Sequence, residues 1–92
     1  MTMNKKRVLY TGGTFDLFHF GHINFLKQCK SIADEVVVSL NTDDFVERFK
    51  GSKPILNYKE REKSVRYCKY VDSVIKNISD EDSRACILTV KP

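Results

Sequence analysis

The chain has 92 residues, of which 41% are hydrophobic and 30% charged, and its formal net charge at pH 7 is +4. This length and composition predict one small packed domain over residues 1–92 and exclude a disordered chain. The modest positive charge suits a small anionic ligand. Because no run of five like charges occurs and the aromatic residues are not interleaved with basic ones, we expect no nucleic-acid partner.

The cysteines and the amino-terminal residues bear on where the protein resides. Cys29, Cys68 and Cys86 form no Cys-x-x-Cys pair, and their odd number argues against a closed disulfide framework, so we interpret them as small apolar core residues. The basic start, residues 1–7, is followed by only three apolar residues. That run is too short for a secretory signal, and no segment is long enough to cross a membrane. We expect a cytoplasmic protein without a membrane span.

Strand and helix patterns alternate along the chain. Apolar and β-branched runs predict strands, and apolar residues at helical spacing together with capping residues predict helices. In chain order we expect a strand over 8–11, a helix over 20–33, a strand over 35–41, a short helix capped by Asn41 or Thr42 and ending at Phe49, a helix from Asn57 to about Tyr70, a strand over 71–76 and a helix from Ser79 to about Val90.

This series predicts an α/β fold with a parallel sheet and right-handed crossovers. The simplest architecture is the first half of a Rossmann-like fold, with three strands in the order 3-2-1 and flanking helices. We expect the chain to be truncated at Pro92 before a fourth strand. The first strand would then be an open edge of the sheet, and open edges attract partners.

The segment from Gly13 to His22 holds most of the functional information, and it lies where the first strand turns into the first helix. His19 and His22 are three residues apart at a helix start and therefore face the same way. Gly21 lets a ligand approach the backbone, and the free amides of a first helical turn attract anions. The pair could instead cap the helix or bind zinc, but no third ligand stands at a recognisable spacing. The pattern favours a phosphate site built with imidazoles over a metal site.

Gly13-Thr14-Phe15-Asp16 followed by His19-x-Gly21-His22 resembles the nucleotidyltransferase superfamily that carries an HxGH motif. Segments 41–43, 58–61 and 67–74 resemble the cytidylyltransferase branch, closest to the glycerol-3-phosphate cytidylyltransferases, and the resemblance runs from about Arg7 to Ile78. It implies that a phosphomonoester such as glycerol 3-phosphate attacks the α-phosphorus of CTP, which forms CDP-glycerol and releases pyrophosphate. It also implies Mg²⁺ bound with the CTP and a homodimer.

The resemblance, with the residue pattern, assigns roles at the site. The histidines hold the triphosphate and stabilise developing charge, Asp16 orients its loop by accepting backbone N–H bonds, and lysines of the loop after the second helix contact CTP and the acceptor phosphate. The register leaves Lys50 and Lys53 as candidates, and a solvated loop is the alternative for both. The expected catalytic residues are His19, His22 and Lys53, and nucleotide-binding roles fall to Gly12, Gly13, Thr14, Phe15, Asp16, His19, Gly21, His22, Lys50 and Arg61.

Several alternatives stay open. Arg61 could be a helix-surface partner of a glutamate, and Asp72 and Lys69 are interpreted as structural. An adenylyltransferase that uses ATP would share the HxGH chemistry, although such branches usually place proline where Leu17 stands. A non-catalytic nucleotide-binding or interaction module is the third reading, because segments that grip the nucleotide in similar proteins do not occur here. The six phenylalanines are expected in the core.

Overall fold

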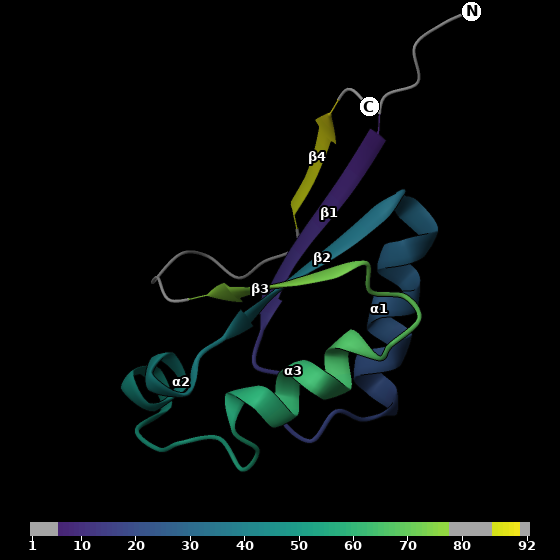
Figure 1. Cartoon of the computed structure of the whole chain (residues 1–92). Coiled ribbons are helices and arrows are strands. Elements are labelled where there is room, and N and C mark those ends of the chain that lie inside the picture. Colours follow the sequence, from purple (N-terminus) through teal and green to yellow (C-terminus); the bar gives the residue numbers. More distant parts are fainter. Residues whose placement is uncertain (1–5, 78–85, 91–92) are drawn as a thin grey trace, which may run out of the picture.

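The computed structural model describes residues 6–77 and 86–90. Figure 1 shows the described elements, which follow the chain as β1 (Lys6–Gly13), α1 (Phe20–Ile32), β2 (Glu35–Asn41), α2 (Asp43–Lys50), α3 (Tyr58–Arg66), β3 (Ser73–Asn77) and β4 (Cys86–Val90). The first six elements confirm the predicted series. No helix in these residues is long and apolar enough to cross a membrane.

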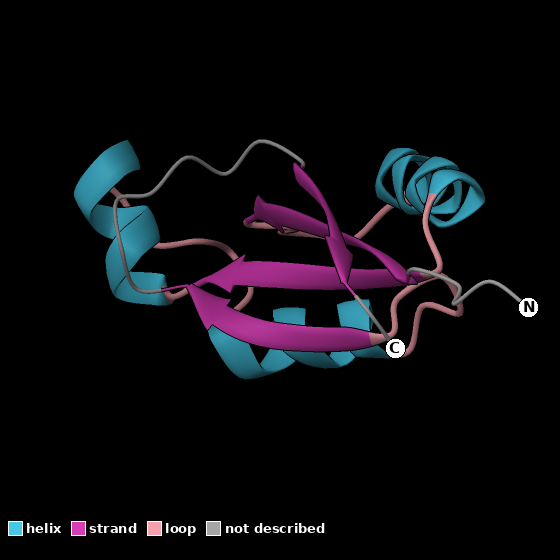
Figure 2. Ribbon diagram, turned by 90° about the horizontal axis from the view of Figure 1, so that it is seen from above, coloured by secondary structure: helices cyan, strands magenta, loops and turns pink. Residues whose placement is uncertain are grey.

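The sheet has the order β3-β2-β1-β4. Strands β1, β2 and β3 are parallel neighbours, which confirms the Rossmann-like α/β fold and the predicted order 3-2-1. In two views at right angles, α2 lies beyond the end of the sheet at which β2 ends (Figures 1 and 2). The carboxyl ends of the parallel strands are therefore bordered by α2 and by the loops that precede α1 and α3.

One face of the sheet carries the core. Leu9 of β1 lies opposite Val36 of β2 in the parallel register, and Val38 and Leu40 follow on the same face at a spacing of two. Helix α1 adds Leu26 and Cys29 to this cluster, α3 adds Val65, and the loop after β1 adds Phe15. Because both helices contribute to one buried cluster, α1 and α3 pack on the same face, as right-handed crossovers require.

The fourth strand corrects the sequence-based prediction. Residues 86–90, expected at the end of a helix, form β4 and pair antiparallel with β1, with Val8 opposite Leu88. Ile87, Thr89 and Val90 are β-branched and favour a strand, and the edge of β1 offers unpaired backbone groups to it. The expectation of an open edge at β1 and of three strands is therefore wrong. The first half of that predicted helix, from Ser79, lies outside the described residues.

The helix caps are among those predicted from the sequence, whereas two phenylalanines lie outside the core in which they were predicted. Thr42 Oγ1 accepts the backbone N–H of Phe45 at 3.1 Å and begins α2. Asn57 and Glu60 exchange side-chain to backbone hydrogen bonds at the start of α3, which ends at Arg66, four residues earlier than expected. Phe20 and Phe49 are 80% and 62% exposed, so the prediction that all phenylalanines lie in the core is wrong.

Two of the three cysteines have described side chains. Cys29 is buried in the core cluster, and burial raises the pKa of its thiol. Cys68 is partly buried and packs against the same cluster. Both confirm the interpretation as apolar core residues, and the side chain of Cys86 lies outside the described part of the chain.

Candidate functional site

The predicted motif lies at the carboxyl end of the parallel strands. The loop of residues 14–19 leaves β1 and leads directly into α1. The end of the neighbouring strand reaches this loop, because the Asn41 side-chain amide Nδ2 donates a hydrogen bond to Thr14 Oγ1 at 3.1 Å. Ligands of open α/β sheets bind at this edge. The topology therefore places the Gly13–His22 segment where a ligand is expected.

The two histidines form a stacked pair at the start of α1. Nδ1 of His19 accepts the backbone N–H of Gly21 at 2.9 Å, and Nδ1 of His22 accepts the backbone N–H of His19 at 3.2 Å. The ring centroids are 3.9 Å apart. Because Nδ1 accepts a hydrogen bond in both rings, the ring proton of each lies on Nε2. The helix start thus gains two N–H donors beside the free amides of its first turn, a combination suited to an anion.

Aromatic packing fixes the orientation of His22. The Phe15 ring meets it edge-on with centroids 5.1 Å apart, and the Phe18 ring stacks on it at 5.5 Å. Burial, followed by the neighbouring His19, holds the pKa of His22 below its ordinary value of 6.5. His22 is therefore neutral at pH 7 and acts as a hydrogen-bond donor through Nε2.

Two motif glycines make room for aromatic rings of the chain itself. A Cβ at Gly13 would lie 2.7 Å from the Phe15 ring, and a Cβ at Gly21 would lie 2.7 Å from Cε1 of His19. Gly21 was expected to let phosphate approach, and the structure supplies a second reason for it, the placement of the His19 ring. Gly12 lies within β1 and pairs with Ser39 of β2.

Asp16 accepts backbone N–H bonds, as predicted, but from a distant segment. Its carboxylate accepts the N–H of Ile55 at 2.7 Å and that of Leu56 at 2.9 Å, in the loop between α2 and α3. Burial raises the pKa of the carboxyl, but the backbone hydrogen bonds from Leu56, Ile55 and Leu17 and the charge of Arg61 outweigh it, so the pKa lies below 3.8. Asp16 is ionised at pH 7 and binds this loop to the motif.

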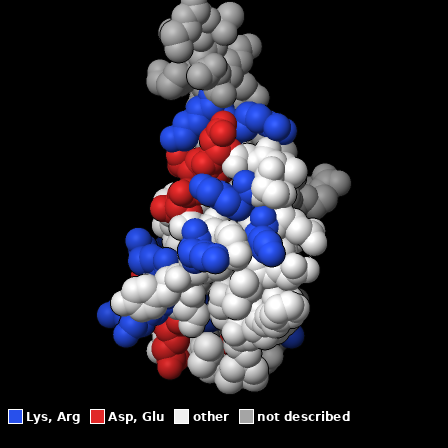
Figure 3. Space-filling model, turned by 90° about the vertical axis from the view of Figure 1, so that its right-hand side faces the viewer, with Lys and Arg blue, Asp and Glu red and all other residues white. Residues whose placement is uncertain are grey.

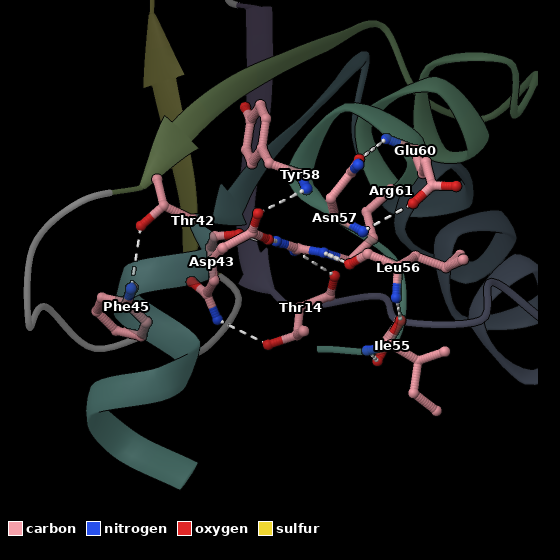
Figure 4. A network of polar contacts seen from close by, with 12 residues as sticks. Thr14, Thr42, Asp43, Phe45, Ile55, Leu56, Asn57, Tyr58, Glu60 and Arg61 are labelled. Carbon is pink, nitrogen blue, oxygen red and sulfur yellow. Dashed lines mark hydrogen bonds and ion pairs between the residues drawn. The ribbon is translucent and has the colours of Figure 1, made fainter. Parts of the chain in front are cut away.

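Arg61 is completely buried behind the motif loop. Its guanidinium donates to the backbone carbonyls of Thr14, Asn41 and Leu56, and it pairs with the Asp43 carboxylate at 2.7 Å (Figure 4). The alternative of a helix-surface partner for a glutamate is therefore wrong. A direct contact between Arg61 and nucleotide stays a prediction, and in this structure its N–H groups point to the chain itself.

Sequence reasoning named Asn41 as one of two candidate caps of α2 and counted Asn41 and Asp43 in a segment that carries the family resemblance, but it placed neither residue in the site. Thr42 is the cap, Asn41 is the last residue of β2 and Asp43 is the first residue of α2. Asn41 is itself buried, and its Oδ1 accepts a hydrogen bond from the Asn77 side chain at 2.8 Å. Asp43 accepts the backbone N–H of Tyr58 with its second oxygen at 3.2 Å. The signal in the sequence was a run of polar residues directly after an apolar strand, at the edge where sites form.

The two candidate lysines precede the Ile55–Leu56 segment to which Asp16 is bonded. Lys50 is the last residue of α2, and Lys53 lies in the loop that leads to Ile55 and Leu56. Both side chains are exposed. The fold thus brings the lysine loop to the imidazole motif, and the individual contacts of the two lysines stay predictions.

Charged side chains cover only part of the face formed by α1. Lysine and arginine side chains gather over part of this face, and a broad area beside them carries no charged side chain (Figure 3). This view shows no continuous basic surface, so the positive charge available to an anion there is local.

A sheet whose parallel strands lead into a glycine-containing turn and a helix start with N–H donors is the arrangement of α/β domains that bind nucleotides. The model of the Cytidylyltransferase-like family matches residues 10–91, and the chain belongs to this family. This confirms the resemblance to HxGH nucleotidyltransferases.

Two similar proteins carry the names of different enzymes. The chain is 46% identical over 74 residues to an ethanolamine-phosphate cytidylyltransferase of Dictyostelium discoideum, covering 79% of this chain and 20% of that protein. It is 47% identical over 75 residues to an FAD synthase of Thermococcus sibiricus, covering 82% and 51%. The chain therefore spans between a fifth and about half of the length of these relatives.

A solved structure confirms the fold. The lipopolysaccharide core biosynthesis protein of Thermoplasma volcanium GSS1 superposes with a TM-score of 0.73 at 33% sequence identity. The match covers 85% of this chain and 62% of that one.

Proposed function

We propose that this chain transfers a cytidylyl group from CTP to the phosphomonoester of a small alcohol and releases pyrophosphate. Glycerol 3-phosphate is the first acceptor we propose, with CDP-glycerol as product, and ethanolamine phosphate is the second because a relative carries that name. The observation that carries the proposal is the stacked pair of His19 and His22, which directs two Nε2–H donors from a helix start.

The reaction needs fixed hydrogen-bond donors from the protein, and the acceptor phosphate itself supplies the nucleophile. An oxygen of the acceptor phosphate forms a bond to the α-phosphorus of CTP, and the bond from that phosphorus to the bridging oxygen of pyrophosphate breaks. Negative charge then grows on the leaving oxygens. The neutral imidazoles donate Nε2–H bonds to these oxygens, and the backbone amides at the start of α1 donate further ones. Because the rings are held by stacking and by their Nδ1 bonds, they do not have to reorganise as the charge develops.

Cations complete the proposed site. Lys53, from the loop that Asp16 and Arg61 hold, is assigned to the reacting phosphates, and Lys50, at the end of α2 directly before that loop, to the nucleotide. Mg²⁺ enters as part of the substrate, bound by the triphosphate oxygens it prefers. Among residues 6–77 and 86–90, no three His, Cys, Asp or Glu side chains group around one point.

A second candidate is adenylyl transfer from ATP. Its support is the FAD synthase that is 47% identical to this chain over 75 residues. The imidazole chemistry at the phosphates is the same for both nucleotides, so the base is the point of difference.

The assay that tests the proposal offers radiolabelled CTP or ATP to the chain with three acceptors: glycerol 3-phosphate, ethanolamine phosphate and choline phosphate. We expect a CDP-linked product and pyrophosphate with CTP. Product formed from ATP alone favours the adenylyl candidate. Failure of every combination contradicts nucleotidyl transfer by this chain and favours a binding module.

We also propose that the chain assembles as a homodimer. Exposed apolar side chains on α1 and directly after α3 support this, among them Phe20, Ile23 and Tyr67. Sedimentation should give about twice the chain mass of 10.7 kDa, and a monomer at all concentrations contradicts it.

A further inference from the structure

The backbone of Leu56 is held from two sides. Its N–H donates to Oδ1 of Asp16 at 2.9 Å, and its carbonyl oxygen accepts a bond from Nε of Arg61 at 3.0 Å. The N–H of Ile55 donates to the second oxygen of Asp16 at 2.7 Å. Figure 4 shows these bonds converging on the Ile55–Leu56 segment. Each bond includes a charged group and is therefore stronger than a bond between neutral groups.

Arg61 extends this attachment to the motif loop. One of its nitrogens, Nη1, donates to the carbonyl of Thr14 at 2.9 Å and to that of Asn41 at 2.7 Å. A single buried guanidinium thus bonds the loop before α1, the end of β2 and the loop before α3. The loop before α1 and the end of β2 are distant in sequence from α3, and this one group bonds to all three segments.

The motif loop is strained on both sides of Asp16. Phe15 and Leu17 each adopt a φ of 49°, a left-handed conformation that residues other than glycine seldom take. Such strain persists only where the surroundings hold it, and it gathers at functional sites. Here the two bonds from Asp16 to the Ile55–Leu56 backbone hold the strained turn.

We propose that Asp16 and Arg61 are positioning residues that lock the loop carrying Lys53 to the loop carrying His19. The lysine and the imidazoles are then presented to a triphosphate as one preformed unit. The effect on nucleotide binding rests on the proposed function, but the lock is a property of the unliganded chain. In the unliganded chain the described bonds of both side chains go to the chain itself.

Because the lock orders the lysine loop before nucleotide binds, it should affect both nucleotide binding and the reaction rate. A loop that must be ordered when nucleotide binds loses conformational entropy at that moment and weakens binding. A small displacement of a cation from the phosphates also slows the reaction. Loosening the lock should therefore weaken CTP binding and slow turnover although His19, His22 and Lys53 remain present.

Amide hydrogen exchange of the unliganded chain tests the lock directly. Asp16→Ala removes both acceptors, so exchange at Ile55 and Leu56 should become about tenfold faster or more relative to the amides of β2, because the lost bonds involve a charged acceptor. The dissociation constant for CTP should rise by about the same factor. If Asp16→Ala does not fold, Asp16→Asn, which retains one acceptor oxygen, should show a smaller effect in the same direction.

Asp72→Asn is the matched control. Asp72 also accepts a backbone N–H, that of Val36 at 2.7 Å, and pairs with Lys30 at 2.9 Å, but at the opposite end of β2. Its substitution should lower stability and speed exchange at Val36, but leave exchange at Ile55 and Leu56 unchanged relative to Val38 and Leu40 of β2.

The two readouts separate the possible failures. Unchanged exchange at Ile55 and Leu56 in both Asp16 variants overturns the lock. Faster exchange with unaltered CTP affinity overturns its role in positioning. If the unsubstituted chain bound no CTP, the proposed function would fail, and the exchange rates would still decide the lock.

Discussion

The imidazole rings of His19 and His22 stack with their centroids 3.9 Å apart, and each uses Nδ1 to accept a backbone N–H at the start of α1. One nitrogen of each ring therefore builds the helix start, and Nε2 can donate to a ligand. Capping and phosphate binding, which compete as interpretations of the sequence, are compatible uses of the same side chains.

His19→Asn separates these two uses. Asparagine is a good N-cap, so the free energy of unfolding should change by less than about 0.5 kcal/mol. The Nε2 donor is lost, and the rate of nucleotidyl transfer should fall by about 100-fold or more. Chemical denaturation and product formation measure the two effects. A destabilised variant with full activity would show that His19 serves the helix alone.

Gly21→Ala tests the steric role of the motif glycine. Alanine favours the helix by about 1 kcal/mol, but its Cβ would lie 2.7 Å from His19 Cε1 and displace the ring. We expect a chain that remains folded and binds CTP at least tenfold more weakly, as measured by calorimetry.

Gly51→Ala is the control for the backbone. Gly51 ends α2 with a φ of +80°, and no atom lies within 4 Å of an added Cβ. The Gly51→Ala variant should lose about 1 kcal/mol of stability through backbone strain alone. A Gly21→Ala variant that bound CTP normally would contradict the steric argument.

Stability should depend on the protonation of His22. Because the pKa of His22 in the folded chain lies below its ordinary 6.5, the unfolded state takes up a proton first as the pH falls. The free energy of unfolding should therefore decrease as the pH falls from 6.5 through the lower pKa of the folded chain. Denaturation across this range should show a smaller decrease for His22→Gln. An equal decrease in both proteins would assign the effect to other groups.

Arg61→Met should be strongly destabilising. It leaves three backbone carbonyls and the Asp43 carboxylate without their buried donor, at a cost of about 3–5 kcal/mol. The matched control is Arg66→Met, since Arg66 pairs with Glu62 at 3.3 Å on the exposed side of the same helix. That change should cost less than about 0.5 kcal/mol. Similar losses in both variants would contradict the assigned role of Arg61.

Local signals in the sequence predict the parallel part of the fold. The capping residues Thr42, Asn57 and Glu60 and the apolar run of residues 35–41 each act within a few residues of their position, so they can be recognised without the structure. The β-branched residues of the run 86–90 favour a strand, but so short an apolar run also fits the end of a helix, and pairing with the edge of β1 makes it a strand.

The candidate site, like the fold, was predicted from the sequence only in part. The spacing of His19 and His22 predicts their shared orientation, and the backbone bonds of Asp16 were expected from its loop. The burial of Arg61 was not expected, because its partners come from three segments, at Thr14, at residues 41–43 and at Leu56, and tertiary structure alone brings the first two to α3. The exposure of Phe20 likewise depends on which face of α1 the sheet covers.

The most direct test of the central claim is an NMR titration of the isotope-labelled chain with Mg²⁺ and CTP, with ATP in parallel. We expect the Nε2 resonances of His19 and His22 and the backbone amides of Thr14 and Phe15 to shift together as CTP is added, and His19→Asn to abolish the shifts at His22. Binding of CTP that leaves both imidazoles unperturbed would contradict the account.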